Sequence, residues 1–196
     1  IAFDQIIDCV NPGADVNIHD DDNGYTPLHS AAQDLNGSKF IKFLIDHGAD
    51  INSENINGST PLFLTQNMDS LIQLIDRGAD INHQNIAKYS ILHIIAIWGD
   101  RIGMVDKLLE IPNINLNLQD KDGDTSLHIA IRKNDDRLTI KFLRAGARTD
   151  IKNNNNKTPY DYANTEIKKL IDKEKQLFEF TKLKLEQLDP KYKEII

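Results

Sequence analysis

A four-residue phrase that returns at nearly constant intervals constrains the fold of this chain more than any other feature. The phrase is a hydroxyl-bearing residue, two mostly apolar residues and, in three of the five copies, a histidine. Its copies begin at Thr26, Thr60, Ser90, Thr125 and, in degenerate form, Thr158. Subtracting these residue numbers gives intervals of 34, 30, 35 and 33 residues. A second phrase, Gly-Ala-Asp followed by an aliphatic residue and Asn, keeps the same spacing from Gly13, Gly48 and Gly78, with altered copies at Asn113 and Gly146. Two independent phrases at one spacing indicate a chain built from repeats of one structural unit.

The local chemistry of one unit, residues 21–56, predicts two helices separated by a short break. Gly24 follows Asn23 in a turn, since glycine accepts a positive φ without steric cost. Thr26 has the hydroxyl suited to an N-cap, and Pro27 at the first helical position gives up no needed hydrogen bond. The dense apolar residues at 40–45 predict a second, buried helix that ends at Gly48.

The period and the wording of the phrase resemble the ankyrin repeat, whose signature is Thr-Pro-Leu-His-x-Ala at about 33 residues. The resemblance covers roughly residues 1–172. It implies an all-α fold, a solenoid of helix-turn-helix units with short β-hairpin-like loops and a C-terminal capping or extension helix. On this register we expect a partial first repeat at 1–22, repeats at 23–56, 87–121 and 122–155, a shortened repeat at 57–86, a capping repeat at 156–175, and a helical extension or the start of another domain at 176–196.

Two units depart from the common plan in ways that predict local changes. The unit at 57–86 is short by about four residues, and residues 65–68 leave little room for a full first helix and its connecting turn, so we expect a thinner repeat. In the next unit Lys88 stands where the hairpin glycine belongs, which costs strain if the site keeps a positive φ. We therefore expect a rebuilt hairpin tip at Lys88.

Net charge argues against nucleic acid as a partner. The chain carries −7, and residues 166–196 hold eight lysines against seven acidic residues, so the negative charge lies in the repeats before them. A surface this acidic repels phosphate backbones. No apolar run approaches the roughly 20 residues that a membrane span requires, so membrane insertion is not expected.

The cysteine content favours an intracellular, cytoplasmic location. Cys9 is the single cysteine, which excludes an internal disulfide framework, fits a reducing compartment and, in its apolar setting, indicates a packed thiol. Residues 1–10 read as the second helix of a repeat whose first half is missing, so we expect the chain to be a piece of a longer protein. Its richness in Ile, Asn and Lys resembles the divergent arrays of intracellular bacteria, protozoa and large viruses, and a secreted effector would act in the host cytoplasm.

The histidines do not predict a metal or catalytic site. His29, His93 and His128 occupy the fourth place of the phrase and therefore lie about one repeat apart, roughly 10 Å, whereas metal ligands lie about 2 Å from one ion. The family resemblance implies that they tie neighbouring hairpins by hydrogen bonds, a tie that Phe63 removes in one unit. The chain contains no P-loop, G-x-S-x-G or G-x-G-x-x-G motif, so we expect no enzyme activity and no cofactor or metal within it.

The resemblance implies that hairpin tips and first helices form a concave face on which relatives bind protein partners. The positions carried onto this chain are Asp22, Asn23, Tyr25, Asn57, Ser59, Tyr89, Asp122 and Asp124 at the hairpins, and Ile97, Trp98, Arg132 and Lys133 on the first helices. Trp98 is the strongest candidate, because tryptophan and tyrosine are enriched among interface hot spots. Its alternative is a structural filler packed under the turn at 99–100. Arg132 and Lys133 would pair with an acidic segment of the partner.

Three functional hypotheses remain open from the sequence. The first is a monomeric module that binds a protein partner, the second an accessory region of a larger enzyme or effector, and the third a structural spacer. Residues 165–188 read as one helix whose first half caps the solenoid, and whose second half folds back, pairs in a dimer or, as we favour, leads into another domain. Asn52 and Asn82 each follow a leucine by eight residues, which resembles the pattern that asparaginyl hydroxylases accept and is also the plain repeat consensus.

Overall fold

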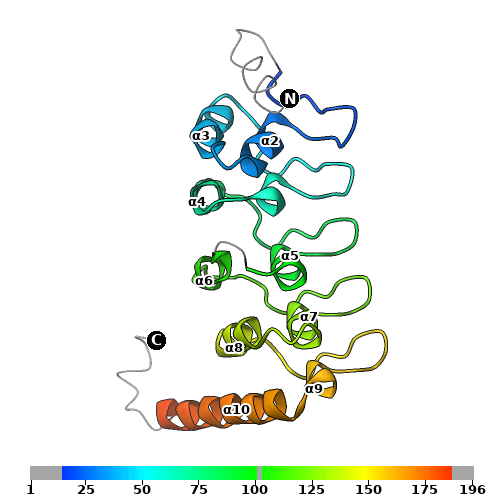
Figure 1. Ribbon diagram of the computed structural model, residues 1–196. Coiled ribbons are helices and arrows are strands. Elements are labelled where there is room, and N and C mark those ends of the chain that lie inside the picture. Colours follow the sequence, from blue (N-terminus) through cyan, green and yellow to red (C-terminus); the bar gives the residue numbers. More distant parts are fainter. Residues whose placement is uncertain (1–14, 101–102, 187–196) are drawn as a thin grey trace.

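The chain forms an elongated stack of helix pairs with hairpin-like loops along one side (Figure 1). The computed structural model describes residues 15–100 and 103–186. No strand occurs in that part of the chain, which confirms the predicted all-α solenoid. The helices form two columns, and each unit contributes one helix to each column (Figure 1).

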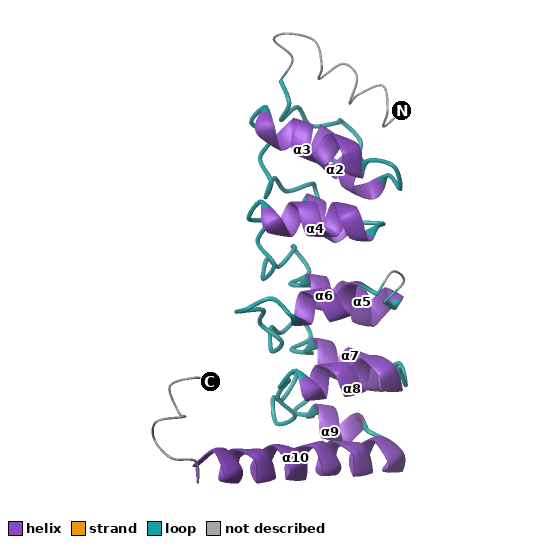
Figure 2. Cartoon of the chain, turned by 90° about the vertical axis from the view of Figure 1, so that its left-hand side faces the viewer, coloured by secondary structure: helices purple, strands orange, loops and turns teal. Residues whose placement is uncertain are grey.

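The first helices of the units lie next to the hairpins, and the second helices form the opposite side of the stack, which faces the viewer in Figure 2. The first-helix column consists of α2 (Pro27–Gln33), the 3-10 turn η1 (Pro61–Leu64), α5 (Ile91–Trp98), α7 (Ser126–Arg132) and α9 (Pro159–Tyr162). The second-helix column consists of α3 (Ser38–Asp46), α4 (Met68–Asp76), α6 (Met104–Leu109), α8 (Asp136–Arg144) and α10 (Thr165–Glu186).

One apolar core runs between the two columns from the first described unit to α10. Its fully buried members are mainly leucines at equivalent places of successive units, such as Leu28, Leu62, Leu92 and Leu127 on the first helices. Each of these side chains packs within its own unit and against a neighbour, as in other solenoids, so stability is distributed along the stack.

The histidines of the repeated phrase form the hydrogen bonds between neighbouring repeats that the family resemblance implied. In each case the ring Nδ1 accepts the backbone N–H of the N-cap residue, at 3.1 Å for Thr26 and His29. The opposite ring nitrogen donates to a backbone carbonyl of the next hairpin, with distances of 2.9, 3.0 and 3.1 Å for His29, His93 and His128. Both nitrogens are therefore engaged, and the tie between repeats is confirmed.

Phe63 occupies the histidine place of the short unit and makes no such tie. Instead, the ring of His83 lies edge-on to Phe63, with centroids 5.8 Å apart, and its Nε2 donates to the carbonyl of Gly58 at 2.7 Å. His83 comes from the following hairpin, so it restores a polar link between these two units from the other direction.

The short unit is thinner, as predicted. Its first helix is the four-residue turn η1, after which Thr65 and Gln66 leave the helical path. The backbone N–H of Gln66 donates to the carbonyl of Ala32 at 3.3 Å, which directs this segment toward α2 and away from α5.

The prediction of a rebuilt hairpin at Lys88 was wrong. Lys88 keeps a φ of 58°, and its backbone N–H donates to the carbonyl of Asn85 at 2.7 Å, as Gly58 donates to Asn55 at 2.8 Å in the preceding hairpin. The side-chain oxygen of Asn85 accepts the backbone N–H of Tyr89, and the carbonyl of Ala87 accepts the N–H of Lys121 in the next hairpin, so the backbone is held in place. The strain is thus accommodated without a change of turn.

The helix predicted from Thr165 begins there and is described to Glu186. Ile167 and Ile171 are buried against the last repeat, whereas Leu177 is 56% exposed. The predicted helix end near Pro190, the expected half-repeat at 1–10 and the packed thiol of Cys9 lie outside the described residues. None of the described helices is long and apolar enough to cross a membrane.

Candidate partner-binding face

A cleft of about 440 Å³ opens in the first-helix column where the short unit lacks a helical turn. One wall is η1 and the residues after it, and the other is the exposed side of α5. The lining includes Phe63, Leu64, Gln66, Ile94, Trp98 and Met104. Most of the lining side chains are apolar, and Ser59, Thr65 and Gln66 add polar groups, so the cleft is a largely apolar recess.

Trp98 stands at the edge of this cleft with 65% of its surface exposed. It is the last residue of α5, and Gly99 ends the helix with a φ of 86°. The alternative of a filler packed under the 99–100 turn is therefore wrong. Ile97, its neighbour in the predicted set, is half-buried and packs against the core.

The predicted hairpin residues divide into exposed and half-buried groups. Asp22, Asn23, Asn57 and Asp122 are exposed. Tyr25 and Tyr89 are half-buried, because each ring lies against the histidine of its own unit. The centroid separations are 5.5 Å for Tyr25 and His29 and 6.0 Å for Tyr89 and His93. Both tyrosines therefore present only part of their surface to a partner.

Ser59 and Asp124 are corrections to the predicted contact set, because both are buried. An asparagine of the following hairpin covers each of them. The side-chain amide of Asn85 lies 3.4 Å from the hydroxyl of Ser59, and that of Asn153 donates to the carboxylate of Asp124 at 2.6 Å. These two side chains serve the contact between hairpins and expose little or no surface, although Ser59 still forms part of the lining of the cleft.

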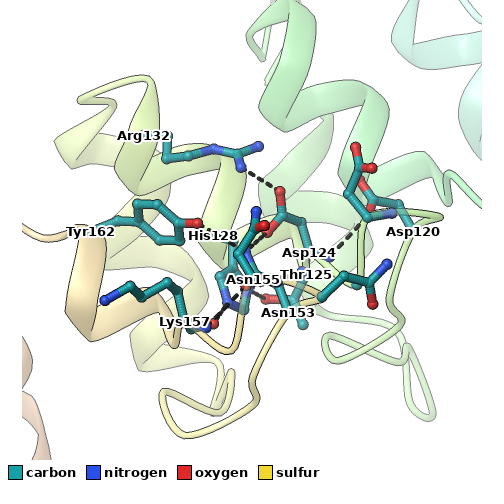
Figure 3. A network of polar contacts seen from close by, with 12 residues as sticks. Asp120, Asp124, Thr125, His128, Arg132, Asn153, Asn155, Lys157 and Tyr162 are labelled. Carbon is teal, nitrogen blue, oxygen red and sulfur yellow. Dashed lines mark hydrogen bonds and ion pairs between the residues drawn. The ribbon is translucent and has the colours of Figure 1, made fainter.

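Arg132 is not a free cation for a partner, because it forms an ion pair with Asp124 at 2.5 Å (Figure 3). Its guanidinium also lies over the ring of Tyr162, 5.6 Å from the centroid, and the hydroxyl of Tyr162 accepts a hydrogen bond from Asn153 at 3.0 Å. The group joins α7, the following hairpin and α9. Lys133, the next residue, is exposed.

The charges of this face are unevenly distributed along the stack. Residues 17–37 and 52–67 supply its hairpins and first helices in the first two described units, and they contain no lysine or arginine. Their acidic residues are Asp20, Asp21, Asp22, Asp34 and Glu54. Desolvation raises the pKa of Asp20, but the backbone hydrogen bonds of the turn together outweigh it, so the pKa is lowered and the charged carboxylate is favoured. In the fourth described unit, Lys121, Arg132 and Lys133 lie among the acidic residues of this face.

The buried histidines have both ring nitrogens engaged in hydrogen bonds within the protein. Burial lowers the pKa of His29, His93 and His128 below the usual value of 6.5, so the neutral ring is favoured. Burial also raises the pKa of Asp120, whose carboxylate accepts backbone hydrogen bonds of 2.9 Å from both Asp122 and Asp124. Within the described ranges no cluster of three or more His, Cys, Asp or Glu side chains is arranged to hold a metal ion.

Asn52 and Asn82 belong to a ladder of asparagine side chains that joins successive units. The side-chain oxygen of Asn52 accepts the backbone N–H of Asp80 at 2.9 Å, and that of Asn82 accepts the N–H of Asn115 at 2.7 Å. Asn82 also donates to the carbonyl of Asn113 at 2.9 Å. These contacts explain both residues structurally, and their hydroxylation stays a prediction.

Sequence reasoning missed two parts of this face. It did not predict that Asn153 and Tyr162 close over Asp124, because that contact joins residues of different units through side-chain geometry. It also did not name Leu64, Ile94 and Met104 as walls of a cleft, although the interval of 30 residues had already marked the missing turn.

Comparison with known proteins identifies the repeated unit. A family model described as ankyrin repeats (3 copies) matches residues 2–85, and another described as ankyrin repeats (many copies) matches residues 111–163. The chain belongs to the ankyrin repeat family. Arrays of this family are generally protein–protein interaction modules, and no catalytic domain is evident in the matches of this ankyrin chain.

Three relatives illustrate the settings in which such arrays occur. The ankyrin repeat protein FPV230 of Fowlpox virus (strain NVSL) is 28% identical over 159 residues, which cover 81% of this chain and 84% of that protein. The ankyrin repeat-containing protein P1E11.10 of Schizosaccharomyces pombe is 41% identical over 49 residues, 25% of this chain and 23% of that protein. The E3 ubiquitin-protein ligase KEG of Arabidopsis thaliana is 27% identical over 158 residues, 76% of this chain and only 8% of that protein.

Proposed function

We propose that this chain is a non-covalent protein-binding module whose partner lies against the hairpins and first helices, with Trp98 as the central anchor. The observation that carries the proposal is the exposure of Trp98, 65%, at the edge of an apolar cleft on this face. A large aromatic side chain left in water beside an apolar recess gains free energy when a partner covers both.

The proposed contact set follows from the exposure of the predicted residues. It comprises Asp22, Asn23, Tyr25, Asn57, Tyr89, Ile97, Trp98, Asp122 and Lys133, with Arg132 at the rim. Among the charged members, each exposed ion pair with a partner contributes little, under about 1 kcal/mol. We therefore expect the aromatic residues to supply most of the affinity and the charges to supply specificity.

The test is a quantitative affinity capture from lysate with three forms of the chain. These are the parent, the Tyr89→Ala, Trp98→Ala double variant, and Leu177→Ala, which removes an exposed apolar side chain from α10 instead. Circular dichroism first establishes that all three are folded. A partner retained by Leu177→Ala and lost by the double variant supports the proposed face. A partner lost only with Leu177→Ala would place the site on α10 and overturn this assignment.

A second candidate is an accessory array within a larger enzyme or effector. The chain matches 8% of the Arabidopsis ubiquitin ligase and 8% of the human 2-5A-dependent ribonuclease, so in both the similar region is a small part of a longer protein. The array would then hold a substrate for a catalytic domain elsewhere. The full open reading frame decides between the two, since the second candidate requires a catalytic domain beyond these residues.

We propose that the chain acts in the cytoplasm and that it is a monomer. The single cysteine and the acidic charge of the repeats support this location, and the similarity to a poxvirus protein supports the cytoplasm of a host cell as the place of action. Light scattering on the purified chain measures the mass in solution, and a dimer would contradict the monomeric form.

A further inference from the structure

We infer that the cleft beside Trp98 takes a large apolar side chain from an extended partner segment, and that this segment carries lysine or arginine residues on the side that lies over the first two hairpins. This inference rests on the proposed function and specifies the chemistry of the partner. Two independent features support it, the apolar recess and the one-sided charge of the surface next to it.

The recess is concave and has room for a large apolar side chain. Its volume of about 440 Å³ falls within the range of roughly 300–1,000 Å³ that is typical of small-molecule pockets. Leu64 and Ile94 line opposite walls and are half-buried, so each still has apolar surface to lose to an occupant. Met104 is buried and contributes to the lining from α6, and methionine adapts its shape to an inserted group.

The surface on the N-terminal side of the cleft carries a single sign of charge. Asp21, Asp22 and Glu54 are exposed there, and the hairpins and first helices of these two units hold no lysine or arginine. The lysines and arginine of the same units, Lys39, Lys42 and Arg77, lie on α3 and at the end of α4, in the second-helix column. A segment that enters the cleft and continues in this direction therefore meets acidic residues and no lysine or arginine.

Charge complementarity selects a basic segment for this path. Several like charges along a surface raise the association rate of an oppositely charged segment and repel an acidic one, and both effects weaken with salt. On the other side of the cleft the fourth hairpin carries both Lys121 and Asp122, and Arg132 is paired with Asp124. That side therefore does not favour a partner segment of one charge sign. The preference for lysine and arginine is thus expected on one side of the anchor.

The test uses a random peptide library displayed on phage and selected against the whole chain. Trp98 is the only tryptophan, so its fluorescence reports directly on the cleft. We expect enriched peptides to combine a large apolar residue with basic residues on one side of it, and a synthetic copy of the leading peptide to shift the Trp98 emission to shorter wavelength. Its affinity is then measured by calorimetry at low and moderate salt.

A matched pair of charge variants separates the acidic face from net charge. Asp21→Asn, Asp22→Asn removes two charges at the first hairpin, and Asp69→Asn, Asp76→Asn removes two exposed charges from α4. We expect the first pair to raise the Kd of the peptide about two- to tenfold at low salt and to reduce its salt dependence, and the second pair to leave the Kd nearly unchanged.

Each other outcome overturns the inference in a defined way. Enriched peptides that are acidic or uncharged and still shift the Trp98 emission contradict the basic segment and leave the proposed function in place. Peptides that bind without changing the Trp98 emission place the occupant outside the cleft. Self-association of the chain that Trp98→Ala abolishes identifies a second copy as the occupant. No enriched peptide, together with a lysate partner lost on Tyr89→Ala, Trp98→Ala, indicates a folded surface as partner; no peptide and no partner removes both proposals.

Discussion

Replacing Lys88 by glycine is expected to stabilise the protein by about 0.5–1 kcal/mol. Lys88 has a φ of 58°, a conformation that costs a residue with a Cβ roughly 1–2 kcal/mol and costs glycine nothing. Glycine in turn loses more backbone entropy on folding, roughly 0.5–1 kcal/mol. The difference between these two magnitudes is the expected gain, and it corresponds to a rise in Tm of about 1–4 °C for a chain of this length.

The spacing between hairpins supports this reasoning. A Cβ on Gly58 would come within 2.9 Å of the backbone nitrogen of Ile86 in the next hairpin, closer than real Cβ atoms approach. Lys88 carries such a Cβ, and the hydrogen bond from its hairpin to the next, from the N–H of Lys121 to the carbonyl of Ala87, is 3.3 Å long. The same bond at the other three described junctions between hairpins measures 3.1, 3.0 and 2.9 Å.

The assay is urea unfolding followed by circular dichroism, with three further variants as controls. Lys88→Ala keeps the strained φ and removes the charge, so it should not stabilise. Asn156→Gly changes a residue that tolerates a positive φ of 56° and should gain less than Lys88→Gly. Gly58→Ala should destabilise by at least 1–2 kcal/mol, roughly the left-handed penalty. An equal gain from Lys88→Ala and Lys88→Gly would refute the argument from φ, because both variants lose the charge and only one loses the Cβ.

Three other predictions concern the polar contacts between units. Burial holds the pKa of the phrase histidines below 6.5, so below that pH the unfolded chain binds more protons than the folded chain. The free energy of unfolding should therefore decrease as the pH is lowered from 6.5, by at most roughly 1.4 kcal/mol per pH unit for each histidine. A free energy of unfolding that stays constant between pH 7 and 5 in urea titrations would contradict this. Arg132→Ala should lower the free energy of unfolding by about 1–3 kcal/mol, because the Asp124 carboxylate, 1% exposed, keeps only one amide partner; the loss stays moderate because water already screens the arginine, which is 42% exposed. Asp124→Asn added to this variant should recover part of the lost stability in chemical unfolding. Strictly additive losses would show that the two residues are not coupled. Asn82→Ala removes two hydrogen bonds between units and should destabilise the protein by about 1–3 kcal/mol, more than Asn52→Ala, which removes one. A lower unfolding midpoint for Asn52→Ala than for Asn82→Ala would refute the ladder as described.

The repeated phrase predicted the fold because each of its residues has a local role. Thr26 and Pro27 start a helix by capping and by a fixed φ, and His29 reaches the next hairpin through a bond that recurs wherever the histidine does. The interval of 30 residues likewise predicted the missing turn, since a helix cannot form from residues that are absent. These features depend on short-range chemistry that a single sequence displays.

The exposure of the candidate contact residues was harder to predict because it depends on the neighbouring unit. Tyr25, Ser59, Tyr89 and Asp124 occupy one position of the register, yet only the tyrosines keep exposed surface. The short side chains of Ser59 and Asp124 are each covered by an asparagine of the next hairpin, whereas each tyrosine ring lies against the histidine of its own unit and keeps part of its surface exposed. The register fixes the position, and side-chain length decides what reaches solvent.

The place of the cleft follows from the way a solenoid distributes its stability. Each unit contacts only its neighbours, so the loss of one helical turn in η1 removes packing from α5 and leaves the remaining units intact. A compact domain with a single core would close over such a gap or lose much of its stability. Here the stack spans the gap because α4 and the second-helix column continue past it, and His83 replaces the tie that Phe63 lacks. The shortened unit therefore leaves a largely apolar recess in the first-helix column, and Trp98 stands at its edge with most of its surface exposed.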